Sequence, residues 1–287
     1  MLCWALLLFL AMPVTVSADM GPKPSVVVEF VGLEKEVYYV TLLSEQESTG
    51  PWSHGNDYYE YMGDEAVFEK FCGYEDEDGY YFLSYMQECS DGDTFEWTYY
   101  PPGKFKILLY FPEQDRFVNV DGTWDRYAFD SYFTVEVSGI EDVIVSENAD
   151  GASIRTYASY DFSMEILSLI ARVICTIAME LLLALLFGYR EKKSLVIIAA
   201  ANLFTQITLN VLLNVINYQS GHYAFVFHYV WMEIVVLMIE AIVYRKHIGG
   251  MNPRTDKKYH PCWYAVTANV LSFVVGLGIA QAIPGMF

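Results

Sequence analysis

The chain has 287 residues, of which 54% are hydrophobic, and its formal net charge at pH 7 is −19. It is too apolar for an average soluble domain, and its charge is so unevenly spread that two separate regions are indicated. Thirty of the 36 acidic residues lie between Asp19 and Asp161, together with only eight Lys or Arg residues. A segment this acidic repels phosphate groups, so nucleic acid and anionic lipid are not expected as its partners.

Residues 1–18 are predicted to be a signal peptide. A short apolar stretch, residues 2–14, is followed by small residues that lead to Ala18. This pattern is typical of a secretory signal, cleaved here before Asp19. No Lys or Arg precedes the apolar stretch, which departs from the usual signal and leaves an uncleaved anchor as the alternative.

Residues 19–162 are predicted to form a β-rich extracytoplasmic domain. The strand segments are rich in aromatic and β-branched residues and are separated by turns that contain Asp, Gly and Pro. They cover residues 26–30, 37–43, 80–86, 95–100, 105–111 and 132–137. A short amphipathic helix is predicted at residues 64–71. About 140 residues suffice for a separate core, so the expected fold is a β-sandwich or an α+β domain.

Cys72 and Cys89 are the only cysteines in this domain, and they could form one disulfide in an extracytoplasmic compartment. A tight turn at residues 76–79 would place Cys72 opposite Phe82 or Leu83, so the bond would have to join neighbouring hairpins, and the pairing is left open. The acidic residues near this turn are expected to be solvated, because their spacing does not match a calcium-binding loop. No metal site is predicted.

Residues 163–287 are predicted to form a transmembrane bundle of four helices. The chain contains four apolar runs, residues 166–187, 195–215, 224–243 and 264–283, and each can span a hydrocarbon core of about 30 Å. The loops 189–194 and 244–261 contain eight Lys or Arg residues, whereas the loop 217–223 and the tail 284–287 contain none. By the positive-inside rule, this indicates a multi-pass plasma-membrane protein whose N-terminal domain is extracytoplasmic and whose C-terminus is outside.

Each predicted span carries one polar face, and the four faces should meet inside the bundle. The faces contain Glu165, Ser168, Arg172, Thr176 and Glu180 on the first helix, Asn202, Gln206, Asn210, Asn214 and Asn217 on the second, Tyr229, Glu233, Glu240 and Tyr244 on the third, and Asn269, Ser272, Gly276 and Ala280 on the fourth. The predicted intramembrane polar cluster comprises Arg172, Glu180, Gln206, Asn210, Glu233 and Glu240.

The estimated depths of these side chains in the bilayer indicate which of them lie close together. Arg172 and Glu233 lie at a similar depth, so an ion pair between them is expected. Glu180 and Glu240 lie together nearer the cytoplasm. Two carboxylates cannot both be ionised in a low dielectric unless water, a cation or a shared proton intervenes. Such a cluster either carries protons or cations, or it simply holds the helices together.

Six short stretches, spread over the whole chain, are similar to segments of a known protein family. They are DMGPKP (19–24), DGYYFL (78–83), WTYYPP (97–102), YAFDS (127–131), MEILSLIA (164–171) and QAIPGMF (281–287). With them, the chain resembles a family of uncharacterised bacterial membrane proteins of the Gram-positive type. Members share a leader, a β-rich ectodomain and four C-terminal transmembrane helices. The resemblance implies a surface-exposed plasma-membrane protein and brings no activity with it.

No enzyme signature occurs in the sequence, which lacks His-Glu-x-x-His, Gly-x-Ser-x-Gly and Cys-x-x-Cys motifs and a Gly-rich phosphate loop. We therefore predict no enzymatic activity and no cofactor. The expected function is that of an envelope binding or sensing protein that presents an acidic ectodomain. The alternative is a small transporter or channel subunit that uses Glu180, Glu233 and Glu240. The expected partners are the lipid bilayer and either another membrane protein or an envelope ligand.

Overall fold

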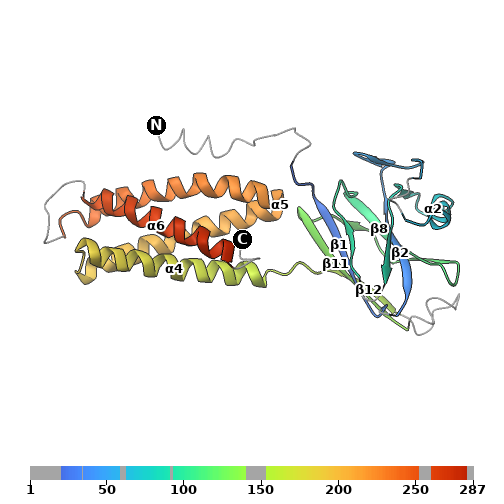
Figure 1. Ribbon diagram of the computed structural model, residues 1–287, viewed down its shortest axis with the longest axis horizontal. Coiled ribbons are helices and arrows are strands. Elements are labelled where there is room, and N and C mark those ends of the chain that lie inside the picture. Colours follow the sequence, from blue (N-terminus) through green and yellow to red (C-terminus); the bar gives the residue numbers. More distant parts are fainter. Residues whose placement is uncertain are drawn as a thin grey trace.

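The computed structural model describes residues 21–33, 35–58, 63–90, 93–139, 153–251 and 260–282. They form a β-rich N-terminal region, which extends to Ala158, and a group of C-terminal helices that begins at Ser163 (Figure 1). The predicted signal peptide, residues 1–18, and the C-terminal residues 283–287 lie outside the described residues.

The β-rich region contains two main sheets. One has four strands in the order β12 (Ser153–Ala158), β11 (Asp130–Ser138), β1 (Ser25–Val31) and β7 (Phe95–Trp97). The other has six strands: β10 (Trp124–Asp125), β8 (Lys104–Phe111), β2 (Val37–Ser44) and β5 (Tyr81–Phe82) follow one another, β6 (Gln87–Ser90) pairs with β2, and β9 (Arg116–Asn119) pairs with β8. β3 (Ser48–Thr49) and β4 (Trp52–Ser53) form a separate hairpin. β1 runs parallel to β11.

The two main sheets pack face to face over a shared apolar core. On β8, Phe105 and Ile107 point into this core. The alternating residues Lys106 and Leu108 therefore face the other side of the six-stranded sheet, where Leu108 packs with α2 (Glu65–Cys72). The region is thus a β-sandwich with one helix on its outer face, and it combines features of the two folds expected from the sequence.

The predicted helix at residues 64–71 is confirmed as α2. The carboxylate of Asp64 caps it by accepting hydrogen bonds from the backbone N–H groups of Ala66 (2.8 Å) and Val67 (3.2 Å), which have no partner inside the helix. Phe68 and Phe71 are buried against the sheet. α2 therefore fixes the start of the acidic loop that follows it on the outer face of the sheet.

Some strands differ from the predicted ones. The strand expected at residues 80–86 is shortened to β5, because Ser84 has a φ of 61° and interrupts the extended backbone. β6, which begins only at Gln87, was not predicted. The strand expected at residues 95–100 ends at Trp97, before Tyr100, whose φ is 52°. The sequence did not predict β9, β10 or β12, which have no sustained apolar alternation.

The disulfide that Cys72 and Cys89 could form is absent, and both are free thiols. Cys72 is the last residue of α2 and is exposed, whereas Cys89 lies on β6 in the core between the two main sheets. The two cysteines thus belong to opposite sides of the six-stranded sheet. A disulfide needs its two Cβ atoms within about 4.5 Å of each other, which this placement does not allow.

The described C-terminal part contains three long helices, α4 (Ser163–Phe187), α5 (Lys192–His247) and α6 (His260–Ala282). α5 is interrupted at Gly221, whose backbone is not helical (φ 78°, ψ 176°). Its first arm (192–220) and second arm (222–247) run antiparallel, because Asn202 contacts Tyr244 and Thr205 contacts Glu240 across them. The loop expected at residues 217–223 is therefore wrong, because these residues continue the two arms on either side of Gly221.

The outside of these helices is apolar, and polar side chains are buried among apolar ones between them. Large apolar side chains such as Phe204 (70% exposed) and Trp263 (67% exposed) lie on the surface. The buried polar side chains of the described helices are Glu180, Ser194, Asn202, Thr205, Gln206, Asn210, Glu240 and Asn269, and they lie beside two clusters of buried apolar residues. Many exposed large apolar side chains together with buried carboxyl groups are unusual for a soluble domain. Two helices, Glu165–Phe187 and Lys192–His247, are long and apolar enough to cross a membrane.

A group of aromatic residues joins the β-rich region to the helices. The backbone N–H of Phe129 donates a hydrogen bond to the carbonyl oxygen of Tyr218 (2.8 Å), near the end of the first arm of α5. The ring of Tyr218 also packs against Tyr160 and Phe162, with ring centroids 5.3 Å and 6.1 Å away. The β-rich region therefore contacts the reversal of α5 at Gly221, at one end of the helices (Figure 1).

Candidate functional site

Two residues of the predicted polar cluster, Glu180 and Glu240, lie together between the helices. Glu180 belongs to α4 and Glu240 to the second arm of α5, and neither side chain is exposed to solvent. Their hydrogen-bond donors Asn202 and Thr205 lie within one turn of the first arm of α5, so the two carboxyl groups lie close together. Glu180 is seven residues from the end of α4 at Phe187, so the pair lies about 10 Å from the end of the helices remote from the β-rich region.

Glu180 is held by neutral side chains. Its Oε2 atom accepts hydrogen bonds from Nδ2 of Asn202 (2.7 Å) and from the hydroxyl of Tyr244 (3.1 Å). The hydroxyl of Tyr264 lies 3.2 Å from the same oxygen and 3.0 Å from the backbone carbonyl oxygen of Glu180. The other carboxyl oxygen, Oε1, is buried and accepts no hydrogen bond from an N–H or O–H group of the described residues.

Glu240 has neutral partners as well. Its Oε1 atom accepts a hydrogen bond from the hydroxyl of Thr205 (2.7 Å), and its Oε2 atom accepts one from Nδ2 of Asn269 (2.7 Å). Thr205 lies on the first arm of α5 and Asn269 on α6. The carboxyl pair is therefore surrounded by α4, both arms of α5 and α6, and none of the donors in these contacts carries a positive charge.

Arg172 belongs to a second polar group, which is separate from the carboxyl pair. It precedes Glu180 by two helical turns on α4, about 12 Å along the helix axis. Its Nη1 atom donates a hydrogen bond to Oδ1 of Asn210 (3.1 Å), and its guanidinium carbon lies 5.7 Å from the centre of the Phe225 ring. Glu233 is close enough to interact with Arg172 through its charge. Arg172 therefore has Asn210 as a hydrogen-bond partner, and the expected ion pair with Glu233 stays a prediction.

Gln206 lies on the first arm of α5, between these two groups. Its side chain is buried, and its backbone carbonyl accepts a hydrogen bond from Nδ2 of Asn210 (2.8 Å). The six residues of the predicted cluster are therefore all found between or beside the helices, but they form two groups at different depths.

Sequence reasoning missed two residues that hold the carboxyl pair. Asn202, Tyr244 and Asn269 lie on the polar faces predicted for the helices, but Thr205 and Tyr264 do not. Thr205 falls three residues after Asn202, a spacing that places both on neighbouring parts of one helix face. Tyr264 begins an apolar run, where a tyrosine is usually attributed to the membrane interface. Its contact with Glu180 depends on the packing of α6.

A second candidate site is a cleft on the outer face of the six-stranded sheet. Its volume is about 660 Å³, and it lies between the loop after α2 and the loop between β9 and β10. α2 is at the end of the molecule opposite the helices (Figure 1). The lining includes five carboxylate groups against one ammonium group, namely Glu75, Asp76, Glu77, Asp78 and Asp121 against Lys106, together with Tyr74, Asn119 and Thr123.

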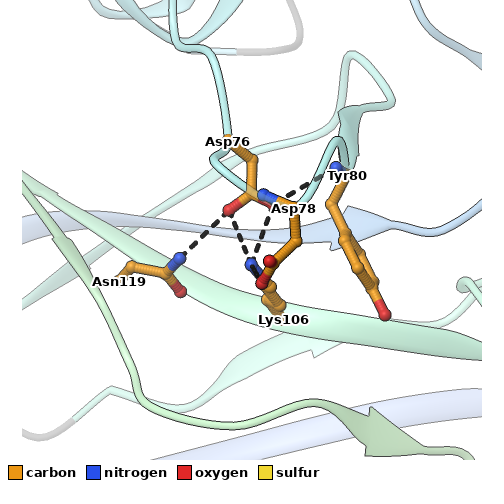
Figure 2. A network of polar contacts seen from close by, with 5 residues as sticks. All are labelled: Asp76, Asp78, Tyr80, Lys106 and Asn119. Atoms are coloured by element: carbon orange, nitrogen blue, oxygen red, sulfur yellow. Dashed lines mark hydrogen bonds and ion pairs between the residues drawn. The ribbon is translucent and has the colours of Figure 1, made fainter.

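Lys106 and Asp76 form a buried ion pair in this cleft (Figure 2). Nζ of Lys106 lies 2.8 Å from Oδ2 of Asp76 and 2.7 Å from Oδ2 of Asp78. The side chains of Lys106 and Asp76 are 7% and 1% exposed, whereas that of Asp78 is 72% exposed. Nδ2 of Asn119 and the backbone N–H of Tyr80 also donate hydrogen bonds to Asp76. These contacts fix the acidic loop on the sheet.

Hydrogen bonds stabilise the charged forms of Asp76 and Lys106. Burial alone would raise the pKa of Asp76, but hydrogen bonds from Lys106 and from the backbone N–H groups of Tyr80 and Asp78 outweigh it and lower the pKa. Burial alone would lower the pKa of Lys106, but its hydrogen bonds to Asp76 and Asp78 outweigh burial and raise that pKa. Both groups are therefore charged at neutral pH.

The acidic loop was expected to be a solvated turn, but Lys106 holds it to the sheet through Asp76, a role that was not predicted. The available signal was the segment KFKILLYF, in which Lys106 stands between Phe105 and Ile107 in an otherwise apolar strand. A lysine in such a position is buried only when it has a partner.

No model of a known protein family matches the chain, and no curated protein matches it. The resemblance to the family of bacterial membrane proteins therefore stays a prediction. Within the described parts of the chain, no group of three or more His, Cys, Asp or Glu side chains is placed to hold a metal ion.

Proposed function

We propose that this chain is an integral plasma-membrane protein, without enzymatic activity, that binds a positively charged ligand at its extracytoplasmic β-rich domain. The observation that carries the proposal is the cleft beside Lys106, which is lined mainly by carboxylates and lies on the side of the domain away from the helices. A volume of about 660 Å³ is typical of a binding site for a small ligand or a short peptide segment.

The apolar surface of the helices supports the membrane part of this proposal. In the most apolar 18-residue windows of α4 and α5, only 17% of the residues are buried. A core helix of a soluble protein with comparable hydropathy would be covered by other elements. A lipid bilayer covers such a surface and leaves the polar side chains to meet between the helices. α4, the two arms of α5 and α6 would then form a four-helix transmembrane bundle.

The distribution of positive charge supports the orientation. Arg190 lies in the link between α4 and α5, Lys192 and Lys193 begin the first arm of α5, and Arg245 and Lys246 lie in the last turn of its second arm. All five belong to the end of the helices opposite the β-rich region (Figure 1). The positive-inside rule assigns this end to the cytoplasm, so that the β-rich domain and the C-terminus are outside.

Thiol labelling in intact cells tests this orientation, in a variant whose native cysteines are replaced by serine. Ser220→Cys, beside the reversal of α5, should react with a membrane-impermeant maleimide. Thr255→Cys, in the predicted cytoplasmic loop that lies outside the described residues, should react only after the cells are permeabilised. Labelling of position 255 from outside would overturn the proposed topology.

The charges at the rim of the cleft define the ligand. Lys106 is already paired with Asp76 and Asp78, whereas the carboxylates of Glu75, Glu77 and Asp121 are exposed. The net potential at the rim is therefore negative, which attracts a cationic ligand and raises its rate of association. The half-buried ring of Tyr74 lines the same cleft and offers a face for a cation.

Binding of a fluorescent oligolysine peptide to the detergent-purified full chain tests the ligand class. The double variant Glu77→Gln/Asp121→Asn should lower the affinity by about tenfold, because each change removes a rim charge. The matched control is Glu65→Gln/Glu69→Gln on α2, which removes the same charge from exposed positions outside the cleft lining. An equal loss in both double variants, or no binding by the unmodified chain, would contradict the proposal.

A second candidate function is that of a small transporter or channel subunit that uses Glu180, Glu233 and Glu240. The observation that favours it is the buried Glu180–Glu240 pair, whose hydrogen-bond donors are all neutral. Against it, the groove of about 180 Å³ beside Glu233 is lined mostly by apolar side chains, which do not favour the passage of a hydrated ion. Proton or Na⁺ flux into liposomes that contain the purified chain, lost in Glu240→Gln, would favour this second function.

A further inference from the structure

Two buried oxygen atoms without hydrogen-bond donors belong to neighbouring side chains in the helical part. Glu180 Oε1 and Asn202 Oδ1 are both buried, and neither accepts a hydrogen bond from a described N–H or O–H group. The two side chains are joined by the 2.7 Å hydrogen bond between Asn202 Nδ2 and Glu180 Oε2. A buried acceptor without a partner is unfavourable, so two of them on neighbouring side chains indicate that a proton or a cation belongs there.

The charge of the carboxyl pair leads to the same conclusion. Glu180 and Glu240 are fully buried next to each other, and the donors to them come from Asn202, Thr205 and Asn269 and from tyrosine hydroxyls. Neutral donors stabilise a carboxylate but do not balance its charge. Buried charges in proteins are normally paired or coordinate a metal ion.

A proton shared between the two carboxyl groups would give Glu180 Oε1 a donor but leave Asn202 Oδ1 without one. A proton on Glu180 Oε1 that is donated to Asn202 Oδ1 would satisfy both oxygens, and the dependence of stability on Na⁺ and on pH separates this arrangement from a bound metal cation. A divalent ion is a poor fit, because Ca²⁺ takes six to eight oxygen ligands. Here the second oxygen of Glu180 and both oxygens of Glu240 already accept hydrogen bonds.

We propose that Glu180, Glu240 and Asn202 form a buried binding site for one monovalent cation of the size of Na⁺. Glu180 Oε1 and Asn202 Oδ1 supply its uncommitted oxygen ligands, and Glu240 supplies the second negative charge. The bound ion leaves the site with one net negative charge, which the hydrogen bonds from Thr205, Tyr244 and Asn269 stabilise. This inference does not depend on the ligand-binding function of the β-rich domain.

Tyrosine side chains close the site toward the end of the helices remote from the β-rich region. Tyr189, Tyr244 and Tyr264 are fully buried, and the ring of Tyr264 packs against both other rings, with centroids 5.5 Å and 5.4 Å away. Tyr244 and Tyr264 also contact Glu180, and they are the other titratable groups in hydrogen-bonding contact with the pair. Their packing with Tyr189 keeps the ion away from solvent at this end.

Thermal unfolding of the detergent-purified full chain at constant ionic strength tests the site. NaCl is exchanged stepwise for choline chloride, whose cation is too large for a buried site. A ligand that binds only the folded state stabilises it in proportion to the logarithm of its concentration. Above saturation, the midpoint temperature should therefore rise by about 3 °C or more for each tenfold increase in Na⁺. Retention of radioactive sodium by the monodisperse protein after gel filtration gives an independent readout.

Three variants separate the ion site from a general effect on folding. Glu180→Gln and Glu240→Gln should lose both the Na⁺-dependent shift and the retained sodium. In choline chloride, Glu240→Gln should unfold at or above the temperature of the unmodified chain, because it removes an unbalanced charge. The matched control is Glu233→Gln, which changes another carboxylate of the second arm outside the pair and should keep the Na⁺ response.

Each other outcome would overturn the proposal. Equal midpoints in NaCl and choline chloride would mean that no cation binds. A midpoint that depends on pH but not on Na⁺ would mean that the pair holds only a shared proton. Stabilisation by micromolar Ca²⁺ in excess of that by Na⁺ would mean a divalent site. A variant that does not fold leaves the sodium-retention measurement on the unmodified chain as the deciding test.

Discussion

The ring of Phe129 lies directly against the backbone of Gly221: a Cβ atom built on this glycine would be 2.5 Å from Cε1 of the ring. Gly221 also has a φ of 78°, a conformation that side-chain-bearing residues rarely adopt. One residue therefore permits both the reversal of α5 and the close contact between the β-rich region and the helices.

Substitution of this glycine should be poorly tolerated. Gly221→Ala is expected to lower the thermal midpoint of the purified chain, with a loss of about 1–3 kcal/mol from the backbone conformation alone and a further loss from the clash with Phe129. Gly250→Ala is the control, because Gly250 lies beyond α5 and a Cβ atom added to it would have no neighbouring atom within 4 Å among the described residues. Equal midpoints for the two variants would show that the reversal at Gly221 is not strained by a side chain.

The buried lysine of the cleft should contribute much more to stability than its exposed neighbour on the same strand. Lys106→Met is expected to destabilise the protein by about 3–5 kcal/mol, because it leaves Asp76 charged and buried without its cation. Lys104→Met should have little effect on stability, because the pair of Lys104 with Glu45 is 40% and 53% exposed and is screened by solvent. Urea unfolding followed by tryptophan fluorescence measures both. A combined Lys106→Met/Asp76→Asn variant that recovers no stability would rule out this explanation.

The Asp76–Lys106 pair should also make stability depend on pH at both extremes. The pKa of Asp76 is lowered from 3.8, so its contribution is fully present above that value and is lost as the pH falls through the lower folded-state pKa. The pKa of Lys106 is raised from 10.5, so its contribution is present below that value and is lost as the pH rises through the higher folded-state pKa. We therefore expect the stability difference between the unmodified chain and Asp76→Asn to be constant near neutral pH and to shrink below about pH 4. A constant difference down to pH 2 would contradict this assignment.

Arg172 should show energetic coupling to Asn210 and to Glu233. Arg172→Leu is expected to lower the amount of folded protein strongly, and Glu233→Gln is expected to lower it less, because a neutral amide still accepts a hydrogen bond. Double-mutant cycles of Arg172→Leu with Asn210→Leu and with Glu233→Gln, measured as thermal stability in detergent, should each recover part of the loss, by about 0.5–3 kcal/mol. Strict additivity in both cycles would mean that Arg172 is stabilised by other contacts, for example by packing on Phe225.

Local patterns in the sequence were sufficient for some of these features. The aromatic and aliphatic residues at 105–111 predicted a strand there, and the amides of the first arm, spaced by four residues, predicted a polar face at Asn202, Gln206 and Asn210. The amphipathic pattern of residues 64–71 predicted α2, because the two faces of a helix repeat within about one turn of chain.

The remaining features depend on contacts between distant segments. From the sequence, Gly221 is predicted to be an ordinary loop residue. Its contact with Phe129, some 90 residues earlier in the sequence, appears only in the structure. Tyr264 contacts a carboxyl group on a different helix, and Cys89 is separated from Cys72 by a sheet whose faces the sequence alone does not assign. No periodicity within one segment contains this information.

The last described helix, α6, supplies Asn269 to Glu240 and Tyr264 to Glu180. Both helices that carry these carboxyl groups are therefore synthesised before the residues that complete their hydrogen bonds. In the proposed transmembrane topology, the first three helical segments enter the bilayer with these two carboxyl groups incompletely satisfied, a state that favours retention by the insertion machinery. A nascent chain that stops before residue 260 should therefore be cleared by membrane proteases.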